Sequence, residues 1–229
     1  MGQLKHFVLR PRWRPLTAWL LPLVLSLGLM FGVHAAVTAD TPPTTDQLAQ
    51  YLQNNALDVT TDTVDGYQQV YYHYQGQKVY ITGAVYNHTH PAASGEYVVW
   101  EGLADNHGQI YLYDVLTDAL IRIVSPGTSE NPSLFQDSVV WEEWLNDSWQ
   151  IFYYNGFTIQ QVSVDNVPSV RPSINAHQVI YAEQFPTYWQ TISYDIASGQ
   201  RTVIMQGDES STAYPHFAPD GTIRTGINP

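Results

Sequence analysis

Cysteine is absent from all 229 residues of the chain. This excludes a disulfide framework, a cysteine nucleophile and a lipid-bearing cysteine near the N-terminus. A domain of this size must therefore be held together by packing alone. The 7 Trp, 16 Tyr and 7 Phe residues supply the large apolar side chains that such packing needs.

Basic residues are also scarce, with 9 Lys and Arg against 21 Asp and Glu and a formal net charge of −12. Four of the nine lie close together at the N-terminus, at Lys5, Arg10, Arg12 and Arg14. Without residues 1–35 the chain loses these four and no acidic residue, which takes its formal charge to −16. Such an acidic surface repels nucleic acid and anionic membranes, so neither is expected as a partner.

Long apolar runs are absent except for one, the 18 residues 16–33 that follow the basic cluster. The small-residue spacing of Val33-His34-Ala35 fits signal-peptide cleavage after Ala35. The run is also just long enough to span a bilayer, so residues 1–35 are predicted to be a signal peptide or an uncleaved N-terminal membrane anchor. Both readings leave the rest of the chain outside the cytoplasm, in the periplasm, on the cell surface or secreted.

Residues 36–57 are expected to form a linker rich in Thr, Pro and Asp, with a short helix over 46–54 that Thr45 caps. Residues 58–229 show short β-branched and aromatic runs separated by Gly, Asn, Asp and Pro, which predicts many short strands.

An internal repeat organises these strands. Three copies share the spacing Pro, aromatic residue nine positions later, Gln nine later again and Tyr four after that: Pro91, Trp100, Gln109, Tyr113; Pro132, Trp141, Gln150, Tyr154; Pro172, Tyr181, Gln190, Tyr194. A period of roughly 40 residues is typical of one four-stranded blade of a β-propeller. The sequence therefore predicts an all-β fold made of such blades.

Three segments carry a resemblance to a known family. Residues 110–125 (IYLYDVLTDALIRIVS) and 194–204 (YDIASGQRTVI) resemble the TolB-like repeat, in which a strand ends in Asp before a turn and a further apolar strand. Residues 214–223 (YPHFAPDGTI) are similar to the Pro-x-Phe-Ser-Pro-Asp-Gly opening of such a blade. The resemblance implies a β-propeller. It leaves function open, since such propellers serve as periplasmic interaction proteins, as substrate-gating domains of peptidases and as enzymes.

Two incomplete repeats flank the three full ones. Residues 68–82 read as the two outer strands of a blade, and 214–225 read as the inner part of one. If these halves join, they close a four-bladed ring; the alternative is a fragment of a larger propeller.

Several residues are candidates for binding. The acidic candidates are Glu101, Glu142, Glu143, Asp147 and Glu183, and the aromatic candidates are Trp100, Trp141 and Tyr181. A carboxylate ring at a propeller mouth can hold a cation such as Ca²⁺ or steer a basic partner, although carboxylates at strand ends are also ordinary surface charges. The aromatic residues fit wedges between blades as well as a binding ring. His88 and His90 lack an identifiable third ligand, so no metal site is predicted.

No enzyme motif is found. The Gly-x-Ser-x-Gly elbow, the His-Glu-x-x-His helix and the P-loop are all missing, so no catalytic residue is assigned. The sequence therefore favours a non-catalytic interaction module that binds a protein, peptide or glycan of the cell envelope. The alternative is the propeller part of an extracellular hydrolase or lyase, with Glu142, Glu143, Asp147 and His177 converging near the ring axis.

Overall fold

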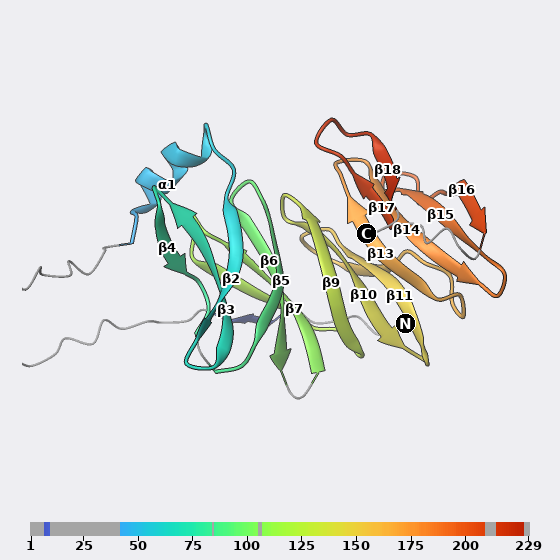
Figure 1. The fold of residues 1–229 in the computed structure, drawn as a ribbon, viewed down its shortest axis with the longest axis horizontal. Coiled ribbons are helices and arrows are strands. Elements are labelled where there is room, and N and C mark those ends of the chain that lie inside the picture. The colour runs from blue at the N-terminus through green and yellow to red at the C-terminus, as the bar shows by residue number, and fades with distance from the viewer. Residues whose placement is uncertain (1–6, 10–41, 84, 105–106, 209–213, 227–229) are drawn as a thin grey trace, which may run out of the picture.

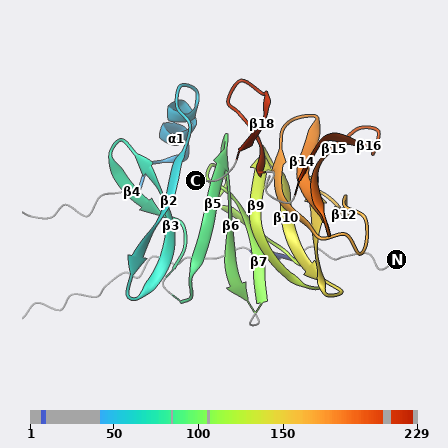
Figure 2. The ribbon, with the colours of Figure 1, turned by 45° about the vertical axis from the view of Figure 1, so that its right-hand side comes forward.

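The computed structural model describes residues 7–9, 42–83, 85–104, 107–208 and 214–226. Its described part forms one helix and eighteen strands, arranged as antiparallel sheets that stand side by side in an arc (Figure 1). The view turned by 45° shows successive sheets facing one another like the blades of a propeller (Figure 2).

In the four-stranded blades the chain runs from the inner strand to the outer strand. The first blade has three strands, β2 (Asp58–Val64), β3 (Tyr67–Tyr74) and β4 (Gln77–Tyr80), and the second has four, β5 (His88–Ser94), β6 (Tyr97–Ala104), β7 (His107–Asp114) and β8 (Ala119–Ile123). The third blade has β9 (Thr128–Phe135), β10 (Ser138–Leu145), β11 (Ser148–Tyr154) and β12 (Ile159–Gln161). The fourth blade has β13 (Ser169–Ile174), β14 (Gln178–Phe185), β15 (Tyr188–Asp195) and β16 (Arg201–Asp208). The strands β2, β3 and β4 of the first blade match the second, third and fourth strands of the later ones. A two-stranded half-blade follows, with β17 (Tyr214–Phe217) and β18 (Ile223–Gly226). The three full repeats therefore coincide with three four-stranded blades, which confirms the predicted fold class.

Of the two alternatives left open by the sequence, the closed four-bladed ring is not formed by the part of the chain that the structure describes. Residues 68–82 contain β3 and β4, as expected, but β2 already pairs with β3 along its whole length. The half-blade lies at the other end of the arc, where β17 packs on β13 and β14. The sequence missed β2 because its residues, DVTTDTV, carry no aromatic residue at the position that Trp100 and Trp141 occupy in later blades.

Helix α1 (Thr45–Leu52) forms where a helix was expected, but its cap lies one residue earlier. Thr44 accepts a hydrogen bond from the backbone N–H of Gln47, and the Gln47 side chain accepts one from the Thr44 N–H, which completes a capping box. Leu48 is buried and packs in the core between the first two blades. The helix is therefore docked on the first blade.

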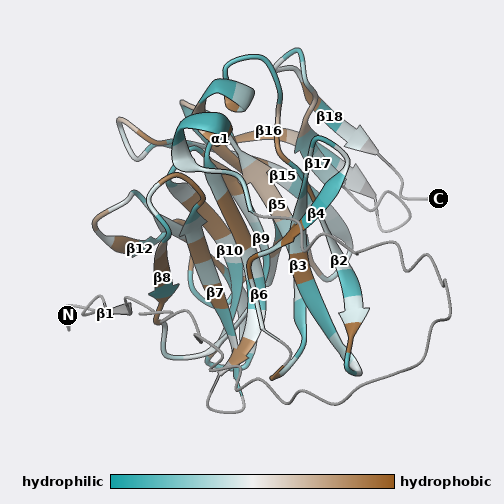
Figure 3. Cartoon of the chain, turned by 90° about the vertical axis from the view of Figure 1, so that its left-hand side faces the viewer, coloured by the Kyte–Doolittle hydropathy of each residue, from teal (hydrophilic) through white to brown (hydrophobic). Residues whose placement is uncertain are grey.

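The blades are held together by apolar layers between neighbouring sheets. Trp100, Trp141 and Tyr181 occupy equivalent places in three successive layers and are 1%, 0% and 0% exposed. Trp100 stacks on Tyr111 and Trp141 on Phe152, each on its own neighbouring strand. Figure 3 shows hydrophobic residues along β7 and β10, while α1 and β2 are mostly hydrophilic. Packing between blades is thus what these three aromatic residues do in the structure.

The outward face of the first blade is polar. Thr60 stands where the next blades carry their aromatic wedge, opposite Tyr71 in the β2–β3 ladder. Lys78 lies over the Tyr71 ring, 4.6 Å from its centroid, and binds Asp62, which also accepts a hydrogen bond from Tyr80. A face covered by such pairs suits water rather than an apolar neighbouring blade.

Strand β1 (Phe7–Leu9) pairs antiparallel with β8 and lies within the segment predicted to direct export. The apolar run 16–33 and the cleavage position after Ala35 lie outside the described residues, so the signal or anchor stays a prediction. Among the residues that are described, no helix is long and apolar enough to cross a membrane.

Candidate functional site

The inner strands of the three full blades share an unusual backbone feature. His90, Asn131 and Arg171 each precede the proline of their repeat and have φ values of 49°, 51° and 59°, in the left-handed region that non-glycine residues rarely adopt. In each blade the register between the first two strands shifts at this point, as in a β-bulge. The bulges turn these three residues out of the ladder at equivalent places along the ring axis.

Two of the predicted acidic residues accept hydrogen bonds from the backbone at these bulges. A carboxylate oxygen of Glu101, in the second blade, accepts the backbone N–H of Asn131 in the third blade at 3.2 Å. Glu142, in the third blade, accepts the N–H of Arg171 in the fourth blade at 2.8 Å. The equivalent residue of the fourth blade is Ala182, and the residue before the next proline, Tyr214, does not have a positive φ. The carboxylates therefore connect successive blades and satisfy donors that the bulges release.

A groove lies beside this axis, at the end where β5 and β9 begin. It has a volume of about 470 Å³ and is lined by Tyr67, Tyr86, Asn87, Thr89, Glu101, Gly102, Leu103, Gly108, Thr128, Ser129 and Glu130. Three blades thus contribute to its walls. Gly108 permits the close approach of β7 to β9, because a Cβ at this position would lie 2.7 Å from the carbonyl oxygen of Ser129. We refer to this cavity as the axial groove.

The axial groove is acidic. Glu101 is buried, accepts a hydrogen bond from the Thr89 hydroxyl at 3.0 Å and contacts the imidazole of His90. Burial, and next the charge of Glu101, raises the pKa of the Glu130 carboxyl, and His90 opposes this rise. A carboxyl whose charge is disfavoured in this way gains most from a cation placed beside it.

The Glu142 carboxyl lies deeper in the interface. Burial raises its pKa, and the N–H of Arg171 and the side chain of Asn131 counteract this by hydrogen bonding. The Arg171 guanidinium lies over the ring of Tyr214, 3.1 Å from its centroid, so the side chain connects the fourth blade to the half-blade. Glu142 and Arg171 are thus positioned to fix the blades.

Glu143 and Glu183 occupy equivalent positions, and each lies opposite the glutamine of its repeat. Glu143 is 0% exposed and accepts hydrogen bonds from the hydroxyls of Ser125 and Ser129, the N–H of Gly127 and the Trp141 indole, all between 2.6 and 3.0 Å. Its acceptor capacity is therefore taken up inside the protein.

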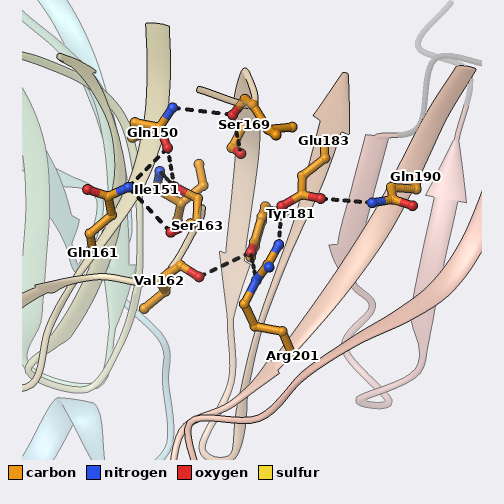
Figure 4. A network of polar contacts seen from close by, with 11 residues as sticks. Gln150, Ile151, Gln161, Val162, Ser163, Ser169, Tyr181, Glu183, Gln190 and Arg201 are labelled. Carbon is orange, nitrogen blue, oxygen red and sulfur yellow. Dashed lines mark hydrogen bonds and ion pairs between the residues drawn. The ribbon is translucent and has the colours of Figure 1, made fainter. Parts of the chain in front are cut away.

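Glu183 forms an ion pair with Arg201 and accepts a hydrogen bond from Gln190 at 2.9 Å (Figure 4). Arg201 in turn donates to the hydroxyl of Tyr181, which donates to the carbonyl of Val162 in the third blade. Figure 4 also shows Gln150 in contact with Ser163 and Gln161 on the neighbouring chain segment. This network spans the third and fourth blades and fixes their relative position.

Asp147 lies away from the axis. With Asn146 it forms the turn between β10 and β11, and both residues have positive φ values of 53° and 60°. Two such residues in a two-residue hairpin loop are typical of a type I′ turn. Asp147 is exposed, and no binding role follows from its position.

The residues proposed for the enzymatic alternative do not converge. Glu142 and Glu143 are adjacent on β10 and point to opposite faces of the sheet. Asp147 is in the β10–β11 turn, while His177 is in the β13–β14 turn at the opposite end of its own blade. The structure thus separates them.

The predicted aromatic candidates are inside the blade interfaces and present no surface to a ligand. None of the three lines the axial groove, and a binding role for Trp100, Trp141 and Tyr181 stays a prediction. The two histidines also have separate surroundings: His88 is buried, accepts a hydrogen bond from the Trp100 indole at 2.9 Å and has its pKa lowered to about 4 by burial, whereas His90 faces Glu101. Among the described residues, no group of three or more His, Cys, Asp or Glu side chains is placed to hold a metal ion.

Sequence reasoning missed most of the groove. Tyr67, Tyr86, Asn87 and Glu130 were not singled out, since none belongs to the repeat motif. Glu130 had one usable signal: it stands two positions before the repeat proline Pro132, on an inner strand, and inner strands line the axis of a propeller. The groove itself follows from how three blades meet.

Comparison with known proteins supports the fold. No protein-family model matches the chain, and no curated protein matches it either. Among solved structures, a TolB candidate from Agrobacterium tumefaciens superposes with a TM-score of 0.54 at 14% identity, covering 76% of this chain and 72% of that one. TolB from Acinetobacter baumannii gives a TM-score of 0.54 at 15% identity over 71% of this chain and 43% of its own length.

A peptidase domain is similar to the same degree. The β-propeller domain of the Trilobed protease from Pyrococcus furiosus, for which an open velcro topology is described, gives a TM-score of 0.52 at 11% identity over 64% of this chain and 48% of that one. The chain thus has a β-propeller fold similar to that of these TolB structures, which agrees with the resemblance seen in its repeats. Identities this low show the fold alone.

Proposed function

We propose that the protein is a non-catalytic, extracytoplasmic interaction module that binds a protein or peptide of the cell envelope, with a basic side chain of the ligand in the axial groove. The position outside the cytoplasm is supported by the N-terminal basic cluster and the uncharged run 16–33. The role as a module is supported by the propeller fold, which offers a rigid frame whose loops and mouth are available to partners.

One observation carries the proposed ligand chemistry. Glu101 and Glu130 come from neighbouring blades and lie close enough for the charge of one to raise the pKa of the other. A Lys or Arg side chain between them relieves this repulsion and finds acceptors already held by the fold. The overall charge of −12 attracts such a ligand from a distance.

The remaining walls fit the stem of a basic side chain. Leu103 is 47% exposed and Tyr67 41% exposed, so both offer apolar surface at the groove. Lys and Arg pack their methylene stems on such surface and their charged ends near aromatic rings. The groove volume of about 470 Å³ lies within the range of ordinary ligand sites.

The test is a pull-down from envelope extract with three forms of the exported protein: wild type, Glu130→Gln and Asp46→Asn. The first substitution removes a groove charge, and the second removes the same charge from exposed helix α1. We expect one or more proteins to be enriched by wild type and by Asp46→Asn, and to be lost or reduced at least about tenfold with Glu130→Gln, equal to about 1.4 kcal/mol.

Acetylation of the captured protein's lysines offers a second readout, because it removes the charge and keeps most of the side chain. Equal capture by all three forms, or capture that survives the loss of every basic group in the ligand, would contradict the axial groove as the binding site.

A further inference from the structure

A cavity separate from the axial groove lies between helix α1 and the first blade. Its volume is about 450 Å³. Its walls include four glutamines and two tyrosines: Gln47, Gln50, Tyr51, Tyr74, Gln75 and Gln77. The first three belong to α1, and the others lie where β3 ends and β4 begins, at the end of the blade beside the helix (Figure 1). We refer to this cavity as the glutamine pocket.

The glutamine pocket is uncharged. Among the residues that the structure describes, none that line it carries a charge. The axial groove, in contrast, is lined by Glu101 and Glu130. A smaller cavity between the second and third blades is lined by Asp114 and Asp137. An uncharged cavity does not select its ligand by charge, so recognition must come from hydrogen bonds and apolar contact.

Most of the glutamine amides in this pocket are available to a ligand. The Gln47 side chain accepts the N–H of Thr44 in the capping box. In the part of the chain that the structure describes, the side-chain amides of Gln50, Gln75 and Gln77 form no hydrogen bond, and these residues are exposed. An amide both donates and accepts, and so does a sugar hydroxyl, whereas a carboxylate only accepts and an ammonium group only donates. A set of amides therefore matches a set of hydroxyls better than it matches either ion.

The two tyrosines give the pocket a fixed aromatic wall. The rings of Tyr51 and Tyr74 meet edge to face, with centroids 5.3 Å apart and an interplanar angle of 62°. Tyr74 belongs to the core between the first two blades, and Tyr51 packs against that core while it stays partly exposed. A ring held in this way offers apolar surface to the C–H groups on the face of a sugar ring.

We propose that the glutamine pocket binds an uncharged oligosaccharide, with one sugar ring against Tyr51 and its hydroxyl groups bonded to the glutamine amides. Because Gln50 comes from the helix and Gln77 from the blade, the amides reach hydroxyls on two edges of the ring. A peptide strand is recognised instead through a row of backbone N–H and C=O groups at a sheet edge. The free polar groups of this pocket are side-chain amides, which favours the saccharide.

This inference does not depend on the proposed function. The glutamine pocket and the axial groove share no lining residue among those described. Glu130→Gln is therefore expected to leave saccharide binding unchanged, and substitutions in the glutamine pocket are expected to leave the capture of an envelope protein unchanged.

The test is titration of the exported protein with maltohexaose, cellohexaose, laminarihexaose and chitohexaose, followed by calorimetry and by saturation-transfer NMR. We expect at least one of these neutral saccharides to bind. Combining Gln50→Ala with Gln77→Ala should raise its dissociation constant at least about tenfold, because two hydrogen-bonding amides are lost. Hexagalacturonic acid, which carries carboxylates, should bind at least about tenfold more weakly than the best neutral saccharide, since an amide pocket leaves its charges without a partner.

A matched pair of turn variants separates binding from folding. Gln75 and Gln136 are exposed, and each begins a two-residue hairpin loop with a positive φ, 50° and 53°. Glycine adopts this conformation readily, so Gln75→Gly and Gln136→Gly should both leave the melting temperature nearly unchanged. Gln75→Gly should raise the dissociation constant of the saccharide at least about threefold, and Gln136→Gly should not change it.

Three results would overturn the proposal. The first is that none of the four neutral saccharides binds. The second is binding that the combined Gln50→Ala and Gln77→Ala variant leaves at full strength. The third is that hexagalacturonic acid, or an uncharged peptide of alanine and serine, binds as tightly as the best neutral saccharide.

Discussion

The first and fourth blades end the arc in opposite ways. The outward face of the first blade is covered by Lys78, Asp62 and Tyr80, which bond to one another over Tyr71. At the other end, the half-blade packs on β13 and β14, and the outermost strand β16 exposes an apolar run. The first blade thus presents a polar surface to water, whereas the fourth blade exposes an apolar surface of the kind that favours association.

The interior interfaces explain why the ends differ. Between blades, Trp100 and Trp141 supply large buried rings, and the third strand adds apolar pairs such as Ile110 with Leu112. At the same third-strand positions the fourth blade carries Thr191 and Ser193. The blades at the ends of the arc therefore have the same backbone arrangement as the others, but polar side chains replace the apolar ones that pack between interior blades.

The largest expected loss of stability comes from truncating an aromatic side chain that is buried between two blades. Trp141→Ala removes a ring that is 0% exposed and should lower the free energy of unfolding by about 4 kcal/mol, because the cavity between two sheets cannot collapse fully. Thr60→Ala, at the equivalent place on the outward face of the first blade, should cost less than about 1 kcal/mol. Denaturant titration measures both. Equal losses at the two positions would contradict the distinction between interior and end.

A smaller loss is expected for the buried carboxylate Glu143. Glu143→Gln replaces one acceptor oxygen by a donor that faces the Ser125 and Ser129 hydroxyls and should destabilise the protein by about 3 kcal/mol. Trp141→Phe, which removes only the indole donor and part of the ring, should cost less. A Glu143→Gln variant with unfolding free energy like wild type would show that the hydrogen bonds contribute little.

Acid should weaken the interface between the first two blades. The pKa of His88 is about 4 in the folded protein, against an ordinary value of 6.5, because burial disfavours the charged ring. The unfolded chain therefore binds more protons between these values, and stability should fall by about 2 kcal/mol as the pH drops from 6.5 towards 4.

His88→Gln keeps an acceptor for the Trp100 indole and should remove this part of the pH dependence. His73→Gln, on the outward face of the first blade, serves as the control. A pH profile of stability that His73→Gln flattens and His88→Gln leaves unchanged would contradict the assignment.

The smallest effect is expected at the polar end itself. Hydrogen bonds from Lys78, Tyr80 and the Thr63 N–H lower the pKa of Asp62, so its contribution to stability is present at neutral pH and is lost as the pH falls through that lowered pKa. Because Asp62 is open to solvent, Asp62→Asn should cause only a slight drop in melting temperature at low salt and none at high salt. A large drop that salt leaves unchanged would indicate that this face is buried against a partner.

Much of the fold was predictable from spacing. The repeat of proline, aromatic residue and glutamine located three blades correctly, because each blade places the same backbone geometry at the same chain interval. The strand β2 escaped this reasoning, since an end blade lacks the aromatic wedge on which the pattern depends. The closed ring was one of two alternatives for the same reason: the two partial repeats look complementary only while β2 is overlooked.

The candidate site was less predictable. Of the predicted acidic residues, Glu101 lines the axial groove, whereas Glu142, Glu143 and Glu183 bind groups inside the protein. A sequence reveals which positions are equivalent between repeats. It does not reveal which of them another blade covers, because burial depends on the neighbour across the interface.

The sequence by itself determined the blades, their order, the acidic character of the chain and the N-terminal segment that predicts export. These features follow from local periodicity and composition, which act over a few tens of residues. Tertiary structure alone decided that the arc is open over the described residues, that Glu130 joins Glu101 in the axial groove and that β16 has a bare edge. Each of these depends on contacts between separate blades, which arise only when the sheets pack against one another.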